Sequence, residues 1–311
     1  MLRRMPRWLG LAIRLAGTAA GLLWIATQVE PAEAGRALGR IPPGTLAIAA
    51  ALVAANVVVA ALRWRVLLRA YGAARVPRFA RLAYLYFVAF FYNNYLPGAV
   101  AGDIGRGVVT RDAFEGEGAA GALAVVLVER ALGLFGLFAL LGVGLATAGR
   151  ALDTGALAAW TAIGCAGSCA LVAMIPLARR IAPYLPGAVG RTAARLPALR
   201  DARAFALALA LSVATQALIV LAGWILLEAL AGTSLSASLL IVPLAAATTF
   251  LPITVGGAGA REAVYVALCG RLFGMPEADA LAASLGLWLA HLAVGAAGGA
   301  LQLAGRRSRT A

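Results

Sequence analysis

The stretch NNYLPGAVAGDIGR, residues 93–106, decides how the fold of this chain is interpreted. It places two amides, a proline, three glycines, an aspartate and an arginine between long apolar runs. Either it is an ordinary water-exposed loop between two membrane helices, or it is polar backbone held inside the membrane. Glycine permits backbone conformations that other residues rarely adopt, so the second arrangement is sterically accessible. The rest of the sequence decides between the two.

Composition predicts an integral membrane protein. Of the 311 residues, 62% are hydrophobic and 13% are charged, and the mean hydropathy is +0.89. A soluble domain is about half apolar and about a quarter charged. The apolar excess is spread along the whole chain, which predicts several spans rather than one anchor. The net charge of +14 comes with arginine as the basic residue throughout. It fits anionic headgroups better than nucleic acid, because the sequence offers no soluble basic face.

The apolar runs predict an all-α polytopic membrane protein with eight membrane-embedded segments. Two short runs, 79–96 and 237–252, end in a leucine-proline pair followed by a glycine-rich polar piece. We interpret the first long run as a retained span rather than a signal peptide, because no clear cleavage site precedes a soluble domain. The six runs that reach about 20 residues, enough for a helical span, are 9–28, 45–62, 119–147, 155–177, 204–230 and 277–303. Arg63 and Arg65 flank Trp64 directly after the second of these runs, and we interpret them as an anchor at the inner membrane boundary.

The distribution of arginine distinguishes two topologies. If both short runs fold back as re-entrant hairpins, 20 arginines lie on one side of the membrane and five on the other. If both runs cross, the counts are 13 and 12. Short cytoplasmic loops carry an excess of basic residues, so the asymmetry favours hairpins. It also predicts a bacterial inner-membrane protein with both termini in the cytoplasm.

The two hairpin tips resemble each other. LPGAVAGDIGR (96–106) aligns without a gap to LPITVGGAGAR (251–261), with five identities at an offset of 155 residues. We therefore predict an inverted repeat, a recurrent transporter design. The first half, 1–150, contains a hairpin near 79–118. The second half, 151–311, contains a basic cytoplasmic linker at 178–203 and a hairpin near 237–272, and the halves form one functional membrane domain.

Polar residues at and beside the tips form the predicted binding site. Unpaired N–H groups of a hairpin tip can bind an anion, and the guanidinium of arginine suits a phosphate bidentately. The expected lipid-headgroup residues are Asn93, Asn94, Asp103, Arg106, Glu129, Arg130, Arg261 and Glu262. The expected tip backbone is Pro97, Gly98, Gly102, Pro252, Gly256, Gly257 and Gly259.

Glu129 and Arg130 lie inside an apolar span. An ionisable residue at the centre of a membrane helix costs about 2.5–3.5 kcal/mol on insertion scales, so it persists when it is paired or faces a polar cavity. Either the two residues form an ion pair that fixes packing, or Glu129 binds a proton or an amine and Arg130 binds a phosphate.

Several motifs of enzyme chemistry are absent from the sequence. It contains no nucleotide-binding loop, no nucleophile elbow and no cluster with metal-ligand spacing. Its three cysteines lie in apolar segments, where small core residues are the simplest interpretation. We therefore predict no catalytic residue, no metal and no cofactor.

The motifs NNYLPGAVAGDIGR, VERALGL and PITVGGAGAREA together resemble the flippase-like transmembrane family related to the membrane domain of lysylphosphatidylglycerol synthase, the multiple peptide resistance factor. The resemblance implies a polytopic inner-membrane protein that moves or exposes charged or glycosylated lipids. We expect no counterpart of the synthase's aminoacyltransferase domain. The family's polar motifs map onto Asn93, Asn94, Pro97, Gly102, Asp103, Arg106, Glu129, Arg130, Gly256, Gly257, Gly259, Arg261 and Glu262.

Three functions stay open at this point. The first is a lipid flippase or translocase that moves a phospholipid or glycolipid through a polar cavity between the hairpins. The second is a non-catalytic membrane partner of a glycosyltransferase or lipid-modifying enzyme. The third is an intramembrane transferase acting on a lipid. The sequence favours the first, without enzyme activity and without a nucleic-acid partner.

Overall fold

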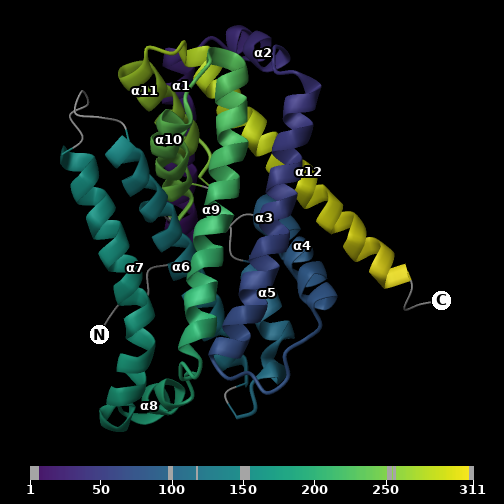
Figure 1. The fold of residues 1–311 in the computed structure, drawn as a ribbon, viewed down its shortest axis with the longest axis vertical. Coiled ribbons are helices and arrows are strands. Elements are labelled where there is room, and N and C mark those ends of the chain that lie inside the picture. The colour runs from purple at the N-terminus through teal and green to yellow at the C-terminus, as the bar shows by residue number, and fades with distance from the viewer. Residues whose placement is uncertain are drawn as a thin grey trace.

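The computed structural model describes residues 7–96, 101–116, 118–147, 155–250, 254 and 257–307. Within these residues the chain is helical, with short 3-10 turns at 111–113, 182–184 and 248–250. Figure 1 shows the helices as one elongated bundle. They are α1 (Arg7–Gln28), α2 (Pro31–Gly39), α3 (Pro43–Ala70), α4 (Phe79–Tyr95), α5 (Ala101–Val109), α6 (Gly118–Thr147), α7 (Gly155–Ile181), α8 (Gly187–Ala194), α9 (Ala202–Ala231), α10 (Leu235–Ala247), α11 (Ala260–Phe273) and α12 (Glu277–Arg307).

Five of the described helices, α3, α6, α7, α9 and α12, are long and apolar enough to cross a membrane. They coincide with five of the six predicted spans. The remaining run forms α1, which is 22 residues long but is not among the five. The two short runs form α4 and α10, of 17 and 13 residues. The all-helical membrane fold is therefore confirmed.

Local sequence sets where these helices begin and end. Asp201 accepts hydrogen bonds from the backbone N–H groups of Arg203 and Ala204, at 2.9 and 3.0 Å, and so caps the start of α9. Gly232 ends α9 in a left-handed conformation with φ of 62°, and Gly274 ends α11 in the same way. Polar and glycine residues at the ends of apolar runs thus mark the boundaries.

Helices α4 and α5 form a first hairpin whose two outer ends lie at the same end of the bundle (Figure 1). The turn before α4 and the turn after α5 touch, because the N–H of Arg75 donates to the carbonyl of Ala113 at 3.3 Å. The side chains of Arg75 and Glu115 also lie 3.6 Å apart. The chain therefore enters the bundle along α4 and returns along α5.

Helices α10 and α11 form a second hairpin, at the opposite end of the bundle (Figure 1). Ala237 near the start of α10 and Met275 after α11 belong to one buried cluster, together with Ile41 after α2. Arg40 pairs with Asp279 at the start of α12 and holds the same end together. The second hairpin therefore approaches the middle of the bundle from the side opposite to the first.

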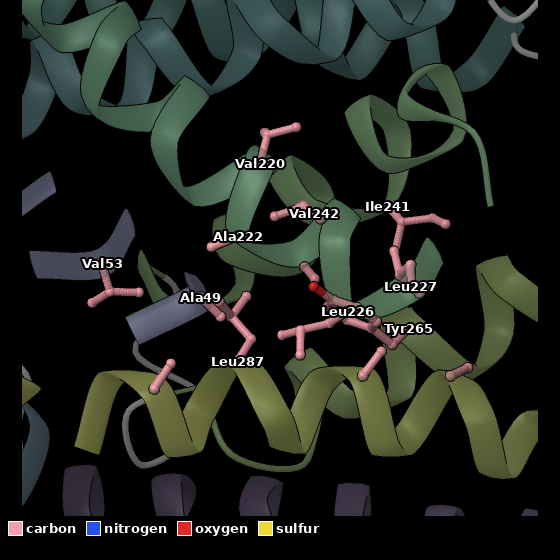
Figure 2. Close-up of a cluster of buried hydrophobic side chains, with 14 of the residues drawn as sticks. Ala49, Val53, Val220, Ala222, Leu226, Leu227, Ile241, Val242, Tyr265 and Leu287 are labelled. Carbon is pink, nitrogen blue, oxygen red and sulfur yellow. The ribbon is translucent and has the colours of Figure 1, made fainter. Parts of the chain in front are cut away.

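The larger hydrophobic core joins α3, α9, α10, α11 and α12. Figure 2 shows Ala49 and Val53 of α3 and Leu226 of α9 near Tyr265 of α11 and Leu287 of α12. Small residues let these helices approach closely, which is the usual basis of helix association where lipid provides no hydrophobic drive. This core fixes the second hairpin against the long helices.

Helix pairs recur in the two halves of the chain. Helix α4 packs on α12, α10 packs on α6, and α3 packs on α9. Glycines allow the first two contacts, because a Cβ at Gly298 would lie 2.1 Å from the carbonyl oxygen of Phe87. Likewise, a Cβ at Gly144 would lie 2.8 Å from the carbonyl oxygen of Leu239. Both contacts therefore depend on a glycine in the long helix that follows one hairpin.

Exposed arginines gather on α8, on the segments next to it and at the outer ends of the first hairpin. Figure 1 shows α8 and these outer ends at the same end of the bundle. We call this the basic end. The linker after α7 folds back on it, because the N–H groups of Arg200 and Asp201 donate to the carbonyl of Ala70, at 2.8 and 3.1 Å. The arginines concerned are Arg69, Arg75, Arg78, Arg81, Arg111, Arg180, Arg191, Arg195, Arg200 and Arg203.

Candidate functional site

The first hairpin is closed by contacts specific to its own residues. The N–H of Gly102 donates to the side-chain oxygen of Asn93 at 2.9 Å, so Asn93 satisfies a free backbone donor at the start of α5. A Cβ at Gly102 would lie 2.1 Å from the carbonyl oxygen of Ala89, so only glycine lets α5 lie against α4 here. Pro97 and Gly98, predicted as tip backbone, fall outside the described residues.

The aspartate of the first hairpin binds two arginines. Asp103 is buried, and its Oδ1 lies 3.0 Å from the Nε of Arg106, one helical turn away. Its Oδ2 accepts a hydrogen bond from the Nε of Arg130, in α6, at 2.9 Å. Two predicted site residues on different helices are therefore joined through Asp103.

Glu129 of α6 is the centre of a second set of contacts. Its Oε1 accepts hydrogen bonds from Nη2 of Arg63 at 3.0 Å and from the hydroxyl of Tyr86 at 2.8 Å. Its Oε2 lies 2.5 Å from Nη2 of Arg106. Glu129 is 1% exposed. Glu129 and Arg130, neighbours in sequence, thus pair with different partners instead of with each other.

Arg106 is enclosed by aromatic rings as well as by carboxylates. Its guanidinium carbon lies 4.5 Å from the ring centre of Trp64 and 4.4 Å from that of Tyr86. A cation over an aromatic face is stabilised by the ring quadrupole, more strongly when water is excluded. Arg106 is 3% exposed, and its Nη1 has no hydrogen-bond partner within the described part of the chain.

Arg63 is the site residue that sequence reasoning missed. The apolar run ending near residue 62 suggested a boundary anchor, but α3 continues to Ala70 and Arg63 is buried. Its Nη1 donates to the hydroxyls of Ser212 and Thr215 of α9, each at 3.3 Å. Trp64, expected at a membrane boundary, is fully buried beside Arg106. The apolar residues that follow RWR in sequence were the available signal.

The second hairpin holds its charges locally. Nε of Arg261 donates to Oε1 of the adjacent Glu262 at 2.9 Å, and the N–H of Gly259 donates to Oε2 of Glu262 at 2.8 Å. Gly257 and Gly259 have φ of 83° and 81°, conformations that favour glycine, as expected for tip backbone. A Cβ at Gly21 of α1 would lie 2.8 Å from Gly259, so the tip packs tightly on α1. Pro252 and Gly256 lie outside the described residues.

Two cavities separate the hairpins. The first, which we call the charge cavity, has a volume of about 200 Å³. Its lining includes predicted site residues as well as residues such as Arg63 that were not predicted to belong to the site. The second, the tip cavity, has a volume of about 530 Å³ and brings the end of α4 to the start of α11. Asn93 lines both cavities. The charge cavity includes Arg63, Asn93, Asp103, Arg106, Glu129, Arg130 and Phe250. The tip cavity includes Asn93, Asn94, Gly259, Arg261, Glu262 and Trp288.

All eight predicted headgroup residues therefore line one or both of these cavities. Within the described residues, no group of three or more His, Cys, Asp or Glu side chains could hold a metal ion. The single histidine, His291, has its Nδ1 at 2.8 Å from the carbonyl of Leu287 and stacks on Phe90, so it serves helix packing.

The chain matches the family described as the lysylphosphatidylglycerol synthase TM region over residues 8–299. It belongs to that family. No curated protein was found to be significantly similar to the chain. The five helices that are long and apolar enough to cross a membrane agree with this membership and indicate a multi-pass membrane protein. The charge cavity and the tip cavity lie within the matched range.

Proposed function

We propose that the protein is a lipid flippase or translocase, in which the charge cavity and the tip cavity receive a lipid headgroup while the acyl chains stay in the bilayer. The observation that carries this proposal is the charged cluster of Arg63, Asp103, Arg106, Glu129 and Arg130, which lines a cavity instead of filling it. All of these residues except the half-buried Arg130 are buried. Charges inside a membrane span are costly and usually mark the pathway of a substrate.

The charge balance of the cluster favours an anionic ligand. Three arginines face two carboxylates, which leaves one excess positive charge, and the hairpin-tip stretches 97–100 and 251–256 contain no ionisable residue. A buried charge without compensation costs several kcal/mol, so a bound phosphate would offset that cost. The guanidinium groups supply the phosphate contacts, and Asp103 and Glu129 supply contacts to a cationic headgroup or a coupling proton.

We further propose that the two hairpins are re-entrant and form an inverted repeat. The contacts of α4 with α12 and of α10 with α6 support it. Helices α4 and α10 begin the two hairpins, and α6 and α12 follow them. In each contact, the first helix of one hairpin therefore packs on the long helix that follows the other hairpin. The outer ends of the two hairpins lie at opposite ends of the bundle, as an inverted arrangement requires. The basic end would face the cytoplasm of a bacterial inner membrane, with both termini there.

The proposed activity needs no chemistry from the protein itself. Transport would draw on an ion gradient or on downstream consumption of the lipid, and the protein would act without catalysing a reaction. In this proposal Arg106, Arg130 and Arg261 bind the phosphate in turn, as the headgroup passes between the tip cavity and the charge cavity beside Asn93.

Reconstitution into liposomes with a fluorescent phosphatidylglycerol tests the proposal, because dithionite reports which leaflet holds the label. The sharpest variant is Arg130→Gln, since its side chain is 32% exposed and its loss leaves two arginines facing two carboxylates. We expect the fold to persist and transport to fall about tenfold, the change that a loss of about 1.4 kcal/mol in headgroup binding produces. Arg130→Lys keeps the charge and should retain part of the activity.

The matched control is Arg75→Gln, which removes a surface arginine at the basic end whose partner Glu115 is also exposed. It should transport at the wild-type rate. Wild-type protein that moves no lipid, or Arg130→Gln that moves lipid as fast as the wild type, would contradict the proposal.

Cysteine labelling tests the re-entrant topology. Single cysteines at Arg36 and Arg191, both exposed, should label from opposite sides of the membrane if both hairpins re-enter. If both short segments crossed, the two positions would lie on the same side. Same-side labelling would overturn the inverted repeat.

A further inference from the structure

A third cavity, larger than the charge cavity and the tip cavity, is a groove beside the first hairpin. It has a volume of about 710 Å³ and lies along α4 and α5, beside the end of α12. We call it the α4–α5 groove. Its wall is mainly apolar, with Leu85, Val88, Leu96 and Val109, and Gln302 of α12 closes one side by donating to the hydroxyl of Tyr92 at 2.8 Å.

The groove is about as long as one leaflet is deep. It extends from Arg81 to Leu96, 15 residues of α4 apart, which is about 22 Å at the rise of an α-helix. One leaflet with its headgroup region is about 20–22 Å thick, half of the whole bilayer. Arg81 is exposed at the basic end, where it stacks over Tyr84 at 5.4 Å. The groove thus combines a cation at headgroup level with an apolar channel running toward the middle of the bundle.

Glycine keeps this channel open. Gly105 lines the groove, and a Cβ built on it would meet no atom within 4 Å. Its neighbour Gly102, by contrast, is needed for the contact of α5 with α4. The space beside Gly105 is therefore not required by helix packing.

The groove also leads to the charged cluster. Arg106 and Ala89 line both the α4–α5 groove and the charge cavity. Arg106 is almost completely buried, and its Nη1 has no hydrogen-bond partner in the described residues. An anion-binding atom is thus left unused at the inner wall of a channel whose outer mouth is marked by another arginine.

We propose that the α4–α5 groove binds one acyl chain of an anionic phospholipid from the leaflet at the basic end, with the phosphate at Arg81. Charge complementarity identifies the occupant, because the exposed Arg78 lies three residues before Arg81 at the start of α4, and the exposed Arg111 lies two residues after Val109, which lines the groove. This inference rests on the proposed function in one respect: it makes the groove the place where the lipid waits before its headgroup moves toward Arg106. The binding of the chain can be measured without transport.

Photolabelling in lipid nanodiscs tests the inference. The probe is phosphatidylglycerol that carries a diazirine in its acyl chain, in a phosphatidylcholine bilayer, and mass spectrometry locates the labelled peptides. We expect labelling on α4 and α5 beside the groove. Gly105→Phe fills the groove and should lower that labelling about tenfold, which corresponds to a loss of about 1.4 kcal/mol in binding. Gly105→Ala leaves the groove open and should label as the wild type does.

The matched control is Gly167→Phe, on the exposed face of α7, where a Cβ also meets no atom within 4 Å. It should leave labelling of the groove unchanged. Equal groove labelling in Gly105→Phe and wild type, or equal labelling by phosphatidylglycerol and phosphatidylcholine probes, would overturn the inference. Groove labelling in a protein that moves no lipid would support the groove and contradict the flippase. Normal transport without groove labelling would support the flippase and contradict the groove as a lipid site.

Discussion

The two hairpins share a plan but hold their charges differently. In the first, Asp103 and Arg106 of α5 bind Glu129 and Arg130 of α6, and Arg63 of α3 joins them. In the second, Arg261 and Glu262 are adjacent in sequence and bind each other.

The long helix after each hairpin explains the difference. Helix α6 carries Glu129, whereas α12 carries Ser284 at the position 155 residues later, and Ser284 only approaches Glu262 at 3.5 Å. The charges of the first hairpin therefore join it to its neighbours by ion pairs, whereas those of the second stay within its own glycine turn and cap. The two hairpins thus have similar backbones but different charge contacts. The charges of the first hairpin bind residues of other helices, and those of the second bind each other within α11.

The largest effect is expected from breaking the first set of contacts. Glu129→Gln leaves Arg63 and Arg106 without their shared carboxylate, and removal of one partner of a buried ion pair costs about 3–5 kcal/mol. Thermal unfolding in nanodiscs should show a large drop in the midpoint temperature. Glu115→Gln, in an exposed pair with Arg75, should change it little. Equal drops for the two variants would refute the buried cluster.

The second prediction concerns how each hairpin closes. Gly102→Ala forces a Cβ against the carbonyl of Ala89, and overpacking of this kind costs about 1–3 kcal/mol. Gly105→Ala, three residues further along α5, meets no atom and removes a helical glycine, so it should be neutral or slightly stabilising. The pair of variants shares one helix and one chemical change. The measurement is the midpoint temperature of thermal unfolding in nanodiscs. If it fell equally in Gly102→Ala and Gly105→Ala, α5 would not lie against α4 as described.

A third prediction isolates the contact between α3 and α6. Arg63→Gln combined with Glu129→Gln removes one charge of each sign, so the excess of one positive charge is unchanged. The double variant should recover about 0.5–3 kcal/mol relative to the sum of the single losses, the usual coupling between residues in one network. Unfolding midpoints of the wild type, both single variants and the double variant complete the cycle. Additive losses would mean that Arg63 and Glu129 do not interact.

The smallest effect is expected in the second hairpin. In Glu262→Gln the side-chain carbonyl can still accept a hydrogen bond from Gly259 or Arg261, so only the charge-assisted part is lost, about 1 kcal/mol. Its midpoint temperature should fall less than that of Glu129→Gln in the same nanodiscs. If Glu262→Gln were the more damaging variant, the ranking of the two hairpins would be reversed.

Much of the site was predictable from local sequence. The leucine-proline breaks and their repeat at an offset of 155 predicted the two hairpins. Polar residues at the first tip identified Asp103 and Arg106, and charges within an apolar run identified Glu129 and Arg130. The positive φ of Gly257 and Gly259 followed from the same pattern. Local sequence reveals these features because a break in a helix or a charge inside the membrane is costly, whichever helices pack around it.

Partner choice was not predictable. Arg63 was interpreted as a boundary anchor, and Tyr86 was not considered, yet both bind Glu129. The sequence left open whether the neighbours Glu129 and Arg130 pair with each other. In the structure they bind different partners, whereas the neighbours Arg261 and Glu262 of α11 bind each other. Such pairings depend on the rotation and depth of each helix against the others.

The sequence by itself determined that this is a multi-pass helical membrane protein with two polar breaks and a charged middle, because hydropathy and backbone hydrogen bonding in lipid leave few alternatives. Tertiary structure alone decided that Arg106 lies between Trp64 and Tyr86, that Asn93 lines both cavities, and that an open groove runs beside Gly105. These features arise where segments distant in sequence pack together, and the packing of small residues between helices sets their geometry.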